Sequence, residues 1–233
     1  MILSLFNLLE GVTMEQSKLE IKEKIRAFWD NSRQNYDSVE AHGVHSESEK
    51  NMWRQGMEKL LGQNFHLKIL DIGTGTGFLA LMLAEMGYSV MGVDWAASKI
   101  EQAKEKALSS NIPVQFQVLD AEKLSIESNT FDAVVSRHVL WTLSDPYAAS
   151  REWARVTKRG GKVIVDIPRM CSHSGSHHFG AEIGKELPFY NGADPQKVEE
   201  MLKAAGLSNI RTMMLDTSNE EDKRTLLVYG EKA

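Results

Sequence analysis

The feature that most constrains this chain is the stretch KILDIGTGTGFLALMLAEMGYSVMGVD at residues 68–94, in which glycines alternate with threonines. Gly73, Gly75 and Gly77 follow an apolar run typical of a buried strand and precede a run with helical character. A strand that passes directly into a helix presents the unpaired N–H groups of the helix N-terminus to a ligand. Because glycine has no side chain, a ligand can approach this backbone closely. The stretch therefore predicts a loop that binds a nucleotide-like ligand.

Two carboxylates and the glycine spacing distinguish between two kinds of ligand. A dinucleotide loop has the spacing Gly-x-Gly-x-x-Gly, and its third glycine would fall at Phe78. Asp71, beside the loop, would repel a pyrophosphate but attract an ammonium or sulfonium group. Asp94 ends the second apolar run, where an acidic residue accepts hydrogen bonds from ribose hydroxyls. A ribose with a cationic amino-acid tail fits these residues better than a ribose with two phosphates, and S-adenosylmethionine has that structure.

The rest of the chain alternates strand-like and helical patterns. The glycine loop and its helix are followed by SVMGVD, ASKIEQAKEKALSS, VQFQVLD, FDAVVSRH, YAASREWARVTKRGG and KVIVDIP. This alternation predicts an α/β fold with mostly parallel strands and helices on both faces of the sheet. Continuous apolar runs such as AVVS predict strands that are buried on both sides. NIRTMMLD and RTLLVYGEKA, joined by a short polar loop, predict an antiparallel pair at one edge.

The N-terminal residues lie outside this alternation. LEIKEKIRAFWDN places apolar side chains on one helical face, and SEKNMWRQGMEKLLG predicts a second helix that Gly62 caps. The predicted organisation is a disordered or dispensable tail at residues 1–18, a helical lid at 19–65 and the main domain at 66–233, with a substrate-covering insertion at 169–192.

The ordered set of motifs resembles the class I S-adenosylmethionine-dependent methyltransferases of the small-molecule, methyltransferase-11 or UbiE-like type. LDIGTGTG matches the first cofactor motif of that family, VMGVDWAASKIEQAK the second, and VLDAEKLSIESNTFDAVVSRHVLWTL the third. The resemblance extends from about Ile25 to Lys232. It implies a Rossmann-like sheet of seven strands, an antiparallel C-terminal edge strand, an N-terminal helical lid, and S-adenosylmethionine as cofactor with S-adenosylhomocysteine as product.

The resemblance also implies which residues hold the cofactor. The glycine loop would wrap the methionine tail, Asp94 would hold the ribose, and Trp95 would pack beside the adenine unless it only packs the start of its helix. A tyrosine of the lid folds over the cofactor tail in many members, which suggests this role for Tyr36 unless it only packs a helix on the sheet. Arg54 either pairs with the cofactor carboxylate or is a solvated surface charge. The implied cofactor-binding residues are Tyr36, Arg54, Asp71, Gly73, Thr74, Gly75, Gly77, Asp94, Trp95, Asp120, Ala121, Ser136 and Arg137.

The acceptor side of the site is less defined. His138 follows the fourth strand, near where the methyl group should emerge, and its ordinary pKa suits a general base; it also has the alternative of orienting a neighbour or lining the pocket. Trp141 either walls the acceptor site or packs a helix. The acceptor atom, whether O, N, S or C, is not fixed by any motif. We therefore predict an S-adenosylmethionine-dependent methyltransferase that acts on a small molecule.

Composition limits the classes of partner that the chain is expected to bind. The net charge of −5 argues against a nucleic-acid partner, and the single cysteine, Cys171, excludes an intrachain disulfide. Without a membrane-spanning stretch or secretory signal, we expect a cytoplasmic monomer or homodimer. The cluster of Cys171, His173, His177 and His178 fits no zinc spacing, so no metal site is predicted. An RNA or protein methyltransferase, a non-catalytic cofactor-binding protein and, least favoured, a dehydrogenase stay as alternatives.

Overall fold

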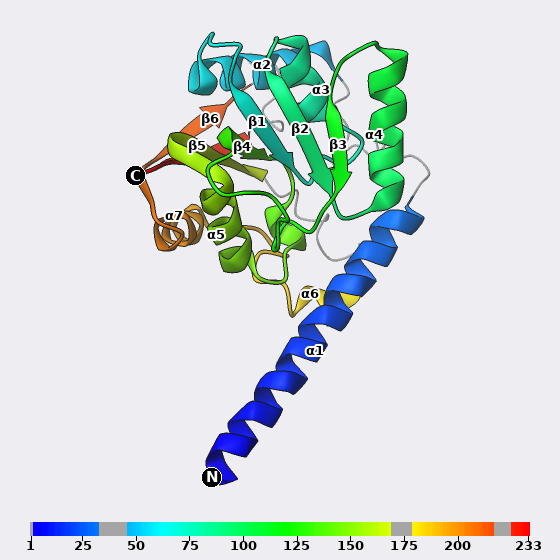
Figure 1. The fold of residues 1–233 in the computed structure, drawn as a ribbon, viewed down its shortest axis with the longest axis vertical. Helices are drawn as coiled ribbons and strands as arrows, with labels where there is room; N and C mark the ends of the chain where they lie inside the picture. The colour runs from blue at the N-terminus through cyan, green and yellow to red at the C-terminus, as the bar shows by residue number, and fades with distance from the viewer. Residues whose placement is uncertain (1, 33–45, 169–178, 217–224) are drawn as a thin grey trace.

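The protein is an α/β domain built on one seven-stranded sheet, seen in a computed structural model that describes residues 2–32, 46–168, 179–216 and 225–233 (Figure 1). The strands are β1 (Lys68–Ile72), β2 (Ser89–Asp94), β3 (Gln115–Val118), β4 (Phe131–Ser136), β5 (Thr157–Pro168), β6 (Leu207–Leu215) and β7 (Thr225–Lys232). The helices are α1 (Ile2–Asn31), α2 (Glu47–Leu61), α3 (Phe78–Glu85), α4 (Ala97–Ser109), α5 (Pro146–Val156), α6 (Gly180–Gly184) and α7 (Pro195–Ala204), with a 3₁₀ turn, η2, at Leu140–Thr142.

The strand order is β3-β2-β1-β4-β5-β7-β6, and the pairs from β3 to β5 are all parallel. β7 runs antiparallel to both β5 and β6, so the only strand of reversed direction in the described sheet lies one place inside the edge. The predicted fold class is therefore confirmed. One detail differs: an antiparallel C-terminal strand is predicted at the edge, but the antiparallel strand β7 lies between β5 and β6, and β6 occupies the edge.

Helices cover both faces of the sheet because the central strands are apolar on both sides. In β1, the fully buried Ile69 packs with α2, α3 and α4, whereas its neighbour Leu70 packs with α5 and α7. Successive side chains of a strand point to opposite faces, so continuous apolar sequences such as those of β1 and β4 serve both layers. The order of the strands reverses between β1 and β4, and the crevice at the carboxyl ends of these two strands is where such sheets bind ligands.

The two N-terminal helices have different positions. α2 belongs to the helical layer, because its Trp53 and Met57 are buried against α3 and the sheet. α1 is one continuous helix where the sequence suggested a tail and a helix from residue 19, and its first half projects away from the body (Figure 1). Its second half lies beside the start of α4, where the Asp30 carboxylate accepts a hydrogen bond from the Ser98 N–H. Nowhere in the described residues is a helix long and apolar enough to cross a membrane.

Helices α5 and α7 begin with the same local signal, an aspartate followed by proline. The Asp145 carboxylate accepts a hydrogen bond from Ala148 N at 2.9 Å, and the Asp194 carboxylate accepts one from Gln196 N at 2.9 Å. Proline suits the first helical position because that residue needs no hydrogen-bond donor there. These caps fix where each helix leaves the carboxyl edge of the sheet.

We expect Asp145→Ala to lower the free energy of unfolding by about 1 kcal/mol, because a helix N–H loses its acceptor. Asp194→Ala is the matched variant and should cost a similar amount, since the second contact of Asp145, a 3.5 Å ion pair with Lys18, is largely exposed and adds little. Urea unfolding of the three proteins measures both losses. A large loss in Asp145→Ala alone would show that the Lys18 contact, and not the cap, holds α5.

Candidate functional site

The glycine loop between β1 and α3 adopts backbone angles that require glycine. Gly73 has φ of 63° and Gly77 has φ of 90°, both in the left-handed region. A Cβ on Gly73 would lie 2.2 Å from Cγ2 of Val139, so the loop also approaches the segment after β4 too closely for any side chain. The Thr74 N–H donates to the carbonyl of Val93 at 2.9 Å, which ties the loop to β2. The loop is thus a fixed cradle rather than an open turn.

Asp94 at the end of β2 holds the loop from the other side. Its Oδ2 accepts a hydrogen bond from Gly75 N at 2.9 Å, and its Oδ1 accepts one from Ala96 N at 2.9 Å. Burial raises the pKa of Asp94, against the lowering effect of these two N–H groups and of Lys99. Each carboxylate oxygen can accept more than one hydrogen bond, so the group can still receive donors from a ligand.

Asp71 lies behind the loop and does not line the cleft described below. Its carboxyl group is buried and accepts a hydrogen bond from Thr74 Oγ1 at 2.7 Å. Burial raises the pKa of Asp71 to about 7, although the Thr74 hydroxyl and the Ala80 N–H lower it. The structure therefore gives Asp71 contacts within the loop, whereas the sequence suggested direct electrostatic attraction of the ligand.

A cleft of about 810 Å³, a volume that includes open solvent at its mouth, runs over the carboxyl ends of β1, β2 and β4. It brings together eight of the predicted site residues: Gly73, Gly75, Asp94, Trp95, Asp120, Ala121, Arg137 and His138. The other lining residues, which sequence reasoning did not single out, are Lys22, Ile25, Arg26, Trp29, Val93, Ala96, Lys99, Leu119, Glu122, Val139, Thr142 and Leu143.

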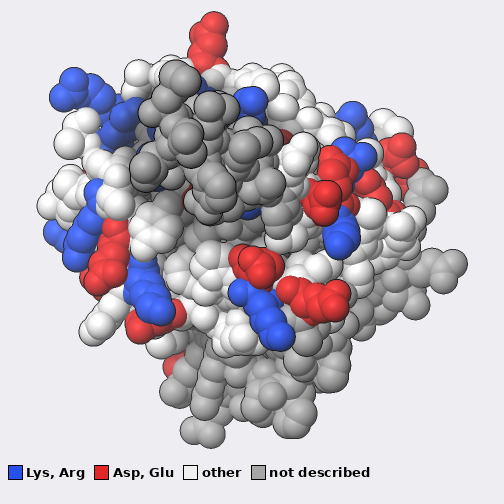
Figure 2. All heavy atoms as spheres, turned by 90° about the horizontal axis from the view of Figure 1, so that it is seen from below, with Lys and Arg blue, Asp and Glu red and all other residues white. Residues whose placement is uncertain are grey.

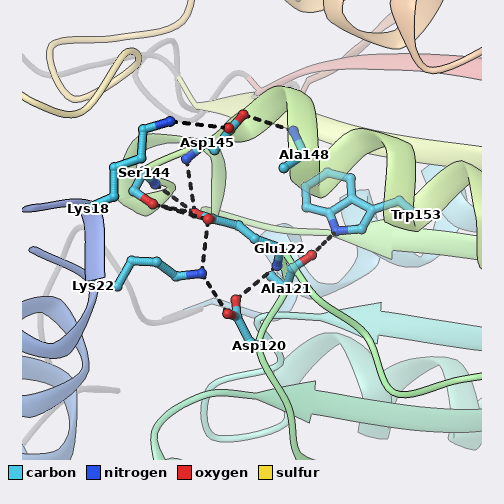
Figure 3. Close-up of polar contacts among 9 residues, drawn as sticks. All are labelled: Lys18, Lys22, Asp120, Ala121, Glu122, Ser144, Asp145, Ala148 and Trp153. Atoms are coloured by element: carbon cyan, nitrogen blue, oxygen red, sulfur yellow. Dashed lines mark hydrogen bonds and ion pairs between the residues drawn. The ribbon is translucent and has the colours of Figure 1, made fainter. Parts of the chain in front are cut away.

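One end of the cleft is closed by charge. Lys22 of α1 places Nζ 2.5 Å from Asp120 Oδ2 and 2.9 Å from Glu122 Oε2 (Figure 3). Burial lowers the pKa of Lys22, but the hydrogen bonds to Asp120 and Glu122 outweigh it and raise the pKa above its ordinary value. Lys22 Nζ also lies 5.0 Å from the ring centroid of Trp95, and the Arg26 guanidinium lies 5.9 Å from it. These contacts of Lys22 and Arg26 hold α1 across the cleft.

The carboxylates that receive Lys22 are themselves held in place. Glu122 Oε1 accepts hydrogen bonds from Ser144 N at 2.8 Å and Asp145 N at 3.0 Å, which link the loop after β3 to the start of α5 (Figure 3). The Ala121 carbonyl accepts a hydrogen bond from Nε1 of the buried Trp153 at 3.0 Å. The segment 120–122 therefore presents its carboxylates to the cleft in a fixed orientation.

The other end of α1 closes over the cleft with aromatic rings. Trp29 meets Trp141 edge-on at 5.8 Å between centroids, and Trp141 stacks on Phe179 at 5.4 Å. Phe28 and Tyr190 complete this aromatic cluster against Phe179. Because these rings come from α1, η2 and the segment next to α6, the cluster joins three parts of the chain that are distant in sequence.

The segment that follows β4 carries three predicted residues. Ser136 is buried and does not line the cleft, and its Oγ has no hydrogen-bond partner among the described residues. The Arg137 guanidinium lies over the rings of Trp53 and Phe78, at 5.5 and 5.1 Å from their centroids, and 3.8 Å from Glu49. His138 lies on the wall of the cleft and also on that of a smaller neighbouring cavity.

The remaining predicted residues lie elsewhere. Arg54 pairs with Glu85 at 3.1 Å on the surface and does not reach the cleft. Trp141 lines the smaller cavity, whose other walls are described below. Tyr36 and the histidines of the 171–178 segment fall outside the described residues, as does Cys171. Within the part of the chain that the structure describes, no group of three or more His, Cys, Asp or Glu side chains is placed to hold a metal ion.

We expect Lys22→Met to speed amide hydrogen exchange in residues 18–31 on the order of fivefold, because α1 loses two ion pairs while keeping a long apolar side chain. Lys24→Met is the matched control, since Lys24 is exposed on the same helix. Hydrogen exchange followed by mass spectrometry measures both. Equal rates in the two variants would mean that the aromatic cluster alone holds α1.

The raised pKa of Asp71 predicts a pH dependence of stability. A carboxyl group with a folded-state pKa of about 7 and an unfolded pKa near 4 stabilises the fold fully below about pH 4, and this contribution is lost as the pH rises through 7. Asp71→Asn has no charge to bury at this position. Between pH 4.5 and 7.5 the free energy of unfolding of the wild type should therefore fall relative to that of the variant. Urea unfolding at several pH values measures this, and a constant difference would contradict it.

Comparison with known proteins identifies the domain. Residues 70–165 match a family model described as a methyltransferase domain. A ubiquinone/menaquinone biosynthesis C-methyltransferase, UbiE, of Bdellovibrio bacteriovorus is 32% identical over 148 residues, which cover 61% of this chain and 61% of that protein. Phosphoethanolamine N-methyltransferase 3 of Arabidopsis thaliana is 31% identical over 144 residues, or 61% of this chain and 29% of that protein. The chain therefore spans at most about three-fifths of these two relatives.

Solved structures show the same fold at lower identity. Magnesium protoporphyrin IX methyltransferase, ChlM, of Synechocystis PCC 6803 with bound SAH aligns over 91% of this chain and 100% of its own, with a TM-score of 0.68 and 18% identity. A cyclase, SpnF, aligns over 78% of this chain and 81% of its own, with a TM-score of 0.62 and 18% identity. Residues 70–165 thus match a methyltransferase domain, and the resemblance of the chain to the class I S-adenosylmethionine-dependent methyltransferases is confirmed.

Proposed function

We propose that the chain is an S-adenosylmethionine-dependent methyltransferase that acts on a small-molecule acceptor. The observation that carries this proposal is the position of Asp94, which lines the cleft between the glycine loop and the ring of Trp95. Its two oxygens point toward backbone N–H groups on both sides, so a ribose bound between loop and ring would meet a carboxylate of fixed orientation.

The residues around Asp94 fit the remaining parts of the cofactor. Gly73 and Gly75 line the cleft without side chains, so the amino-acid tail can approach their backbone. At the other end, Trp95 offers a ring face to the adenine, and Asp120 offers a carboxylate to its amino group. Phe78 stands where a dinucleotide loop has its third glycine, and its ring lies beside Arg137 instead of leaving space for a pyrophosphate.

The bound cofactor supplies an electrophilic methyl group on a sulfonium leaving group. The chain then has to hold the acceptor in line with that group and exclude water. The aromatic cluster of Trp29, Trp141 and Phe179 covers the end of the cleft near His138, which suits the exclusion of water. His138 is the residue on this wall that can hold a proton near neutral pH.

Charge and enclosure support a small acceptor over RNA or protein. The chain carries a net charge of −5. On the face of the molecule that Figure 2 draws, the described Lys and Arg side chains are interspersed with Asp and Glu. A nucleic-acid site needs a basic patch that extends along a surface. The cleft is instead crossed by α1, through contacts of Lys22 and Trp29. The proposal keeps the cytoplasmic location and the monomeric or homodimeric state that the sequence predicts.

Calorimetric titration with S-adenosylhomocysteine tests the proposal, with NAD as the comparison ligand. We expect micromolar binding of S-adenosylhomocysteine alone. Asp94→Asn should weaken it on the order of tenfold or more, because ribose donors lose a charged acceptor. Asp132→Asn controls for a general loss of charge, because Asp132 pairs with Lys158 at the amino end of β4, away from the cleft. Binding of NAD but not S-adenosylhomocysteine would contradict the proposal.

Turnover separates the enzyme from a non-catalytic binding protein. The purified chain, incubated with S-adenosylmethionine carrying a labelled methyl group and a panel of phenols, thiols and amines, should label at least one small molecule. Label that appears only in added RNA or protein would favour a macromolecular acceptor, and tight binding without turnover on any class would favour the binding protein.

A further inference from the structure

His138 is held in a strained conformation by one carboxylate. Its φ of 60° lies in the left-handed region, which residues other than glycine adopt only when the surroundings stabilise it. The His138 backbone N–H donates to Asp166 Oδ1 at 2.6 Å, and the ring atom Nε2 lies 3.4 Å from Asp166 Oδ2. Asp166 therefore fixes the main chain of His138 and places its other oxygen, Oδ2, which accepts no hydrogen bond among the described residues, beside the ring.

Asp166 is an unusual residue for its position. It lies near the carboxyl end of β5, between Val165 and Ile167, and is 1% exposed. An apolar side chain would suit a strand that is covered on both faces, and a buried carboxylate costs free energy unless it is hydrogen-bonded. Burial raises the pKa of Asp166 to about 7, although the His138 N–H and the charge of Arg137 lower it. Burying this acid therefore costs free energy of folding, and its carboxyl group changes charge near neutral pH.

His138 lines two cavities, and Asp166 lines one of them. His138 lines the cofactor cleft, which also contains Gly73 and Asp94. Both His138 and Asp166 line a second cavity of about 270 Å³, a volume that includes open solvent. Its remaining walls are mainly apolar or aromatic: Leu140, Trp141, Phe189, Gly192 and Ala193. A group that enters this second cavity would lie beside both the imidazole of His138 and the carboxyl group of Asp166.

We propose that Asp166 is a positioning residue that orients His138 as the proton acceptor for methyl transfer, and that the acceptor is a small molecule with a protic nucleophile presented from the second cavity. This inference rests on the proposed function and names the acceptor chemistry of the same site. The walls of Trp141 and Phe189 suit a flat or apolar body behind the nucleophile.

The step balances without a further reagent. The acceptor oxygen, sulfur or nitrogen forms a bond to the methyl carbon, and the carbon–sulfur bond breaks with its electron pair on sulfur. The proton of the acceptor passes to the ring nitrogen of His138 that does not face Asp166. The Asp166 carboxylate stabilises the resulting imidazolium through Nε2, so the charge that forms on the ring is compensated where it forms.

Other charges act on the pair and need a control. Arg137 is adjacent to it, and Glu49 of α2 neutralises Arg137 from the far side. Across the cleft, the charged or titratable lining residues are Lys22, Arg26, Asp94, Lys99, Asp120 and Glu122, and Asp71 lies behind the loop. All of these groups are the same in wild type and variant, so only differences between proteins are informative.

The experiment compares the affinities of S-adenosylmethionine and S-adenosylhomocysteine between pH 5 and 9. The first ligand is a sulfonium cation and the second a neutral thioether, so the ratio of their dissociation constants reports the charge near the methyl group. In the wild type both groups of the pair lose positive or gain negative charge over this range, in addition to Asp71, which is the same in every protein compared. The preference for S-adenosylmethionine should therefore rise with pH, on the order of tenfold.

Asp166→Asn and His138→Asn each leave one titrating group of the pair. In each variant the preference for S-adenosylmethionine should therefore rise clearly less with pH than in the wild type. At pH 9, Asp166→Asn should have the lower preference of the two variants. Asparagine tolerates positive φ, so His138→Asn keeps the backbone conformation and provides a second test if Asp166→Asn does not fold. Asp132→Asn should match the wild type.

A wild-type rise in a folded Asp166→Asn or His138→Asn protein would overturn the inference. Failure of the wild type to bind either ligand would overturn the proposed function itself. This outcome differs from the first one, which overturns only the roles of His138 and Asp166.

Discussion

The carboxylate of Asp94 is the interaction on which the rest of the site depends. One buried group accepts the N–H of Gly75 and that of Ala96, so it connects the glycine loop after β1 with the turn after β2. The same group faces the cleft. Loop shape and ligand recognition therefore rely on one side chain, and the cost of burying its charge is offset by backbone donors that the turn would otherwise leave unpaired.

The two ends of the cleft are closed by different physical means, and both involve α1. Near Asp120, the contact is an ion pair with Lys22, which a ligand or salt can compete for. Near His138, the contact is the packing of Trp29 on Trp141, which excludes water without offering a charge. Methyl transfer needs a dry site at the sulfur and a polar one at the adenine, so this difference between the ends agrees with the proposed chemistry.

The sequence predicted the parts of the site that depend on short spacings. Gly73, Gly75 and Asp94 lie within one strand–helix–strand unit, so their proximity follows from the parallel pairing of β1 and β2. Lys22 was missed because its contact with Asp120 spans 98 residues and a surface lysine has no distinguishing pattern. Arg54 was included on its type alone, and the structure pairs it with Glu85. Asp166 has a sequence signal, an acid inside the apolar run VIVDI, but such a run by itself predicts only a buried strand.

The fold alone does not fix the reaction, since a cyclase shares it with a TM-score of 0.62. The segments that decide the chemistry are those that follow β4 and line the second cavity. There the chain keeps two features that oppose folding, a histidine at φ 60° and a carboxylate buried in β5. Each one stabilises the other through the same 2.6 Å hydrogen bond, yet an apolar residue on β5 and a glycine after β4 would avoid both costs. A pair that is unfavourable for folding, and whose histidine lines two cavities, agrees better with the proposed proton transfer than with a role in packing.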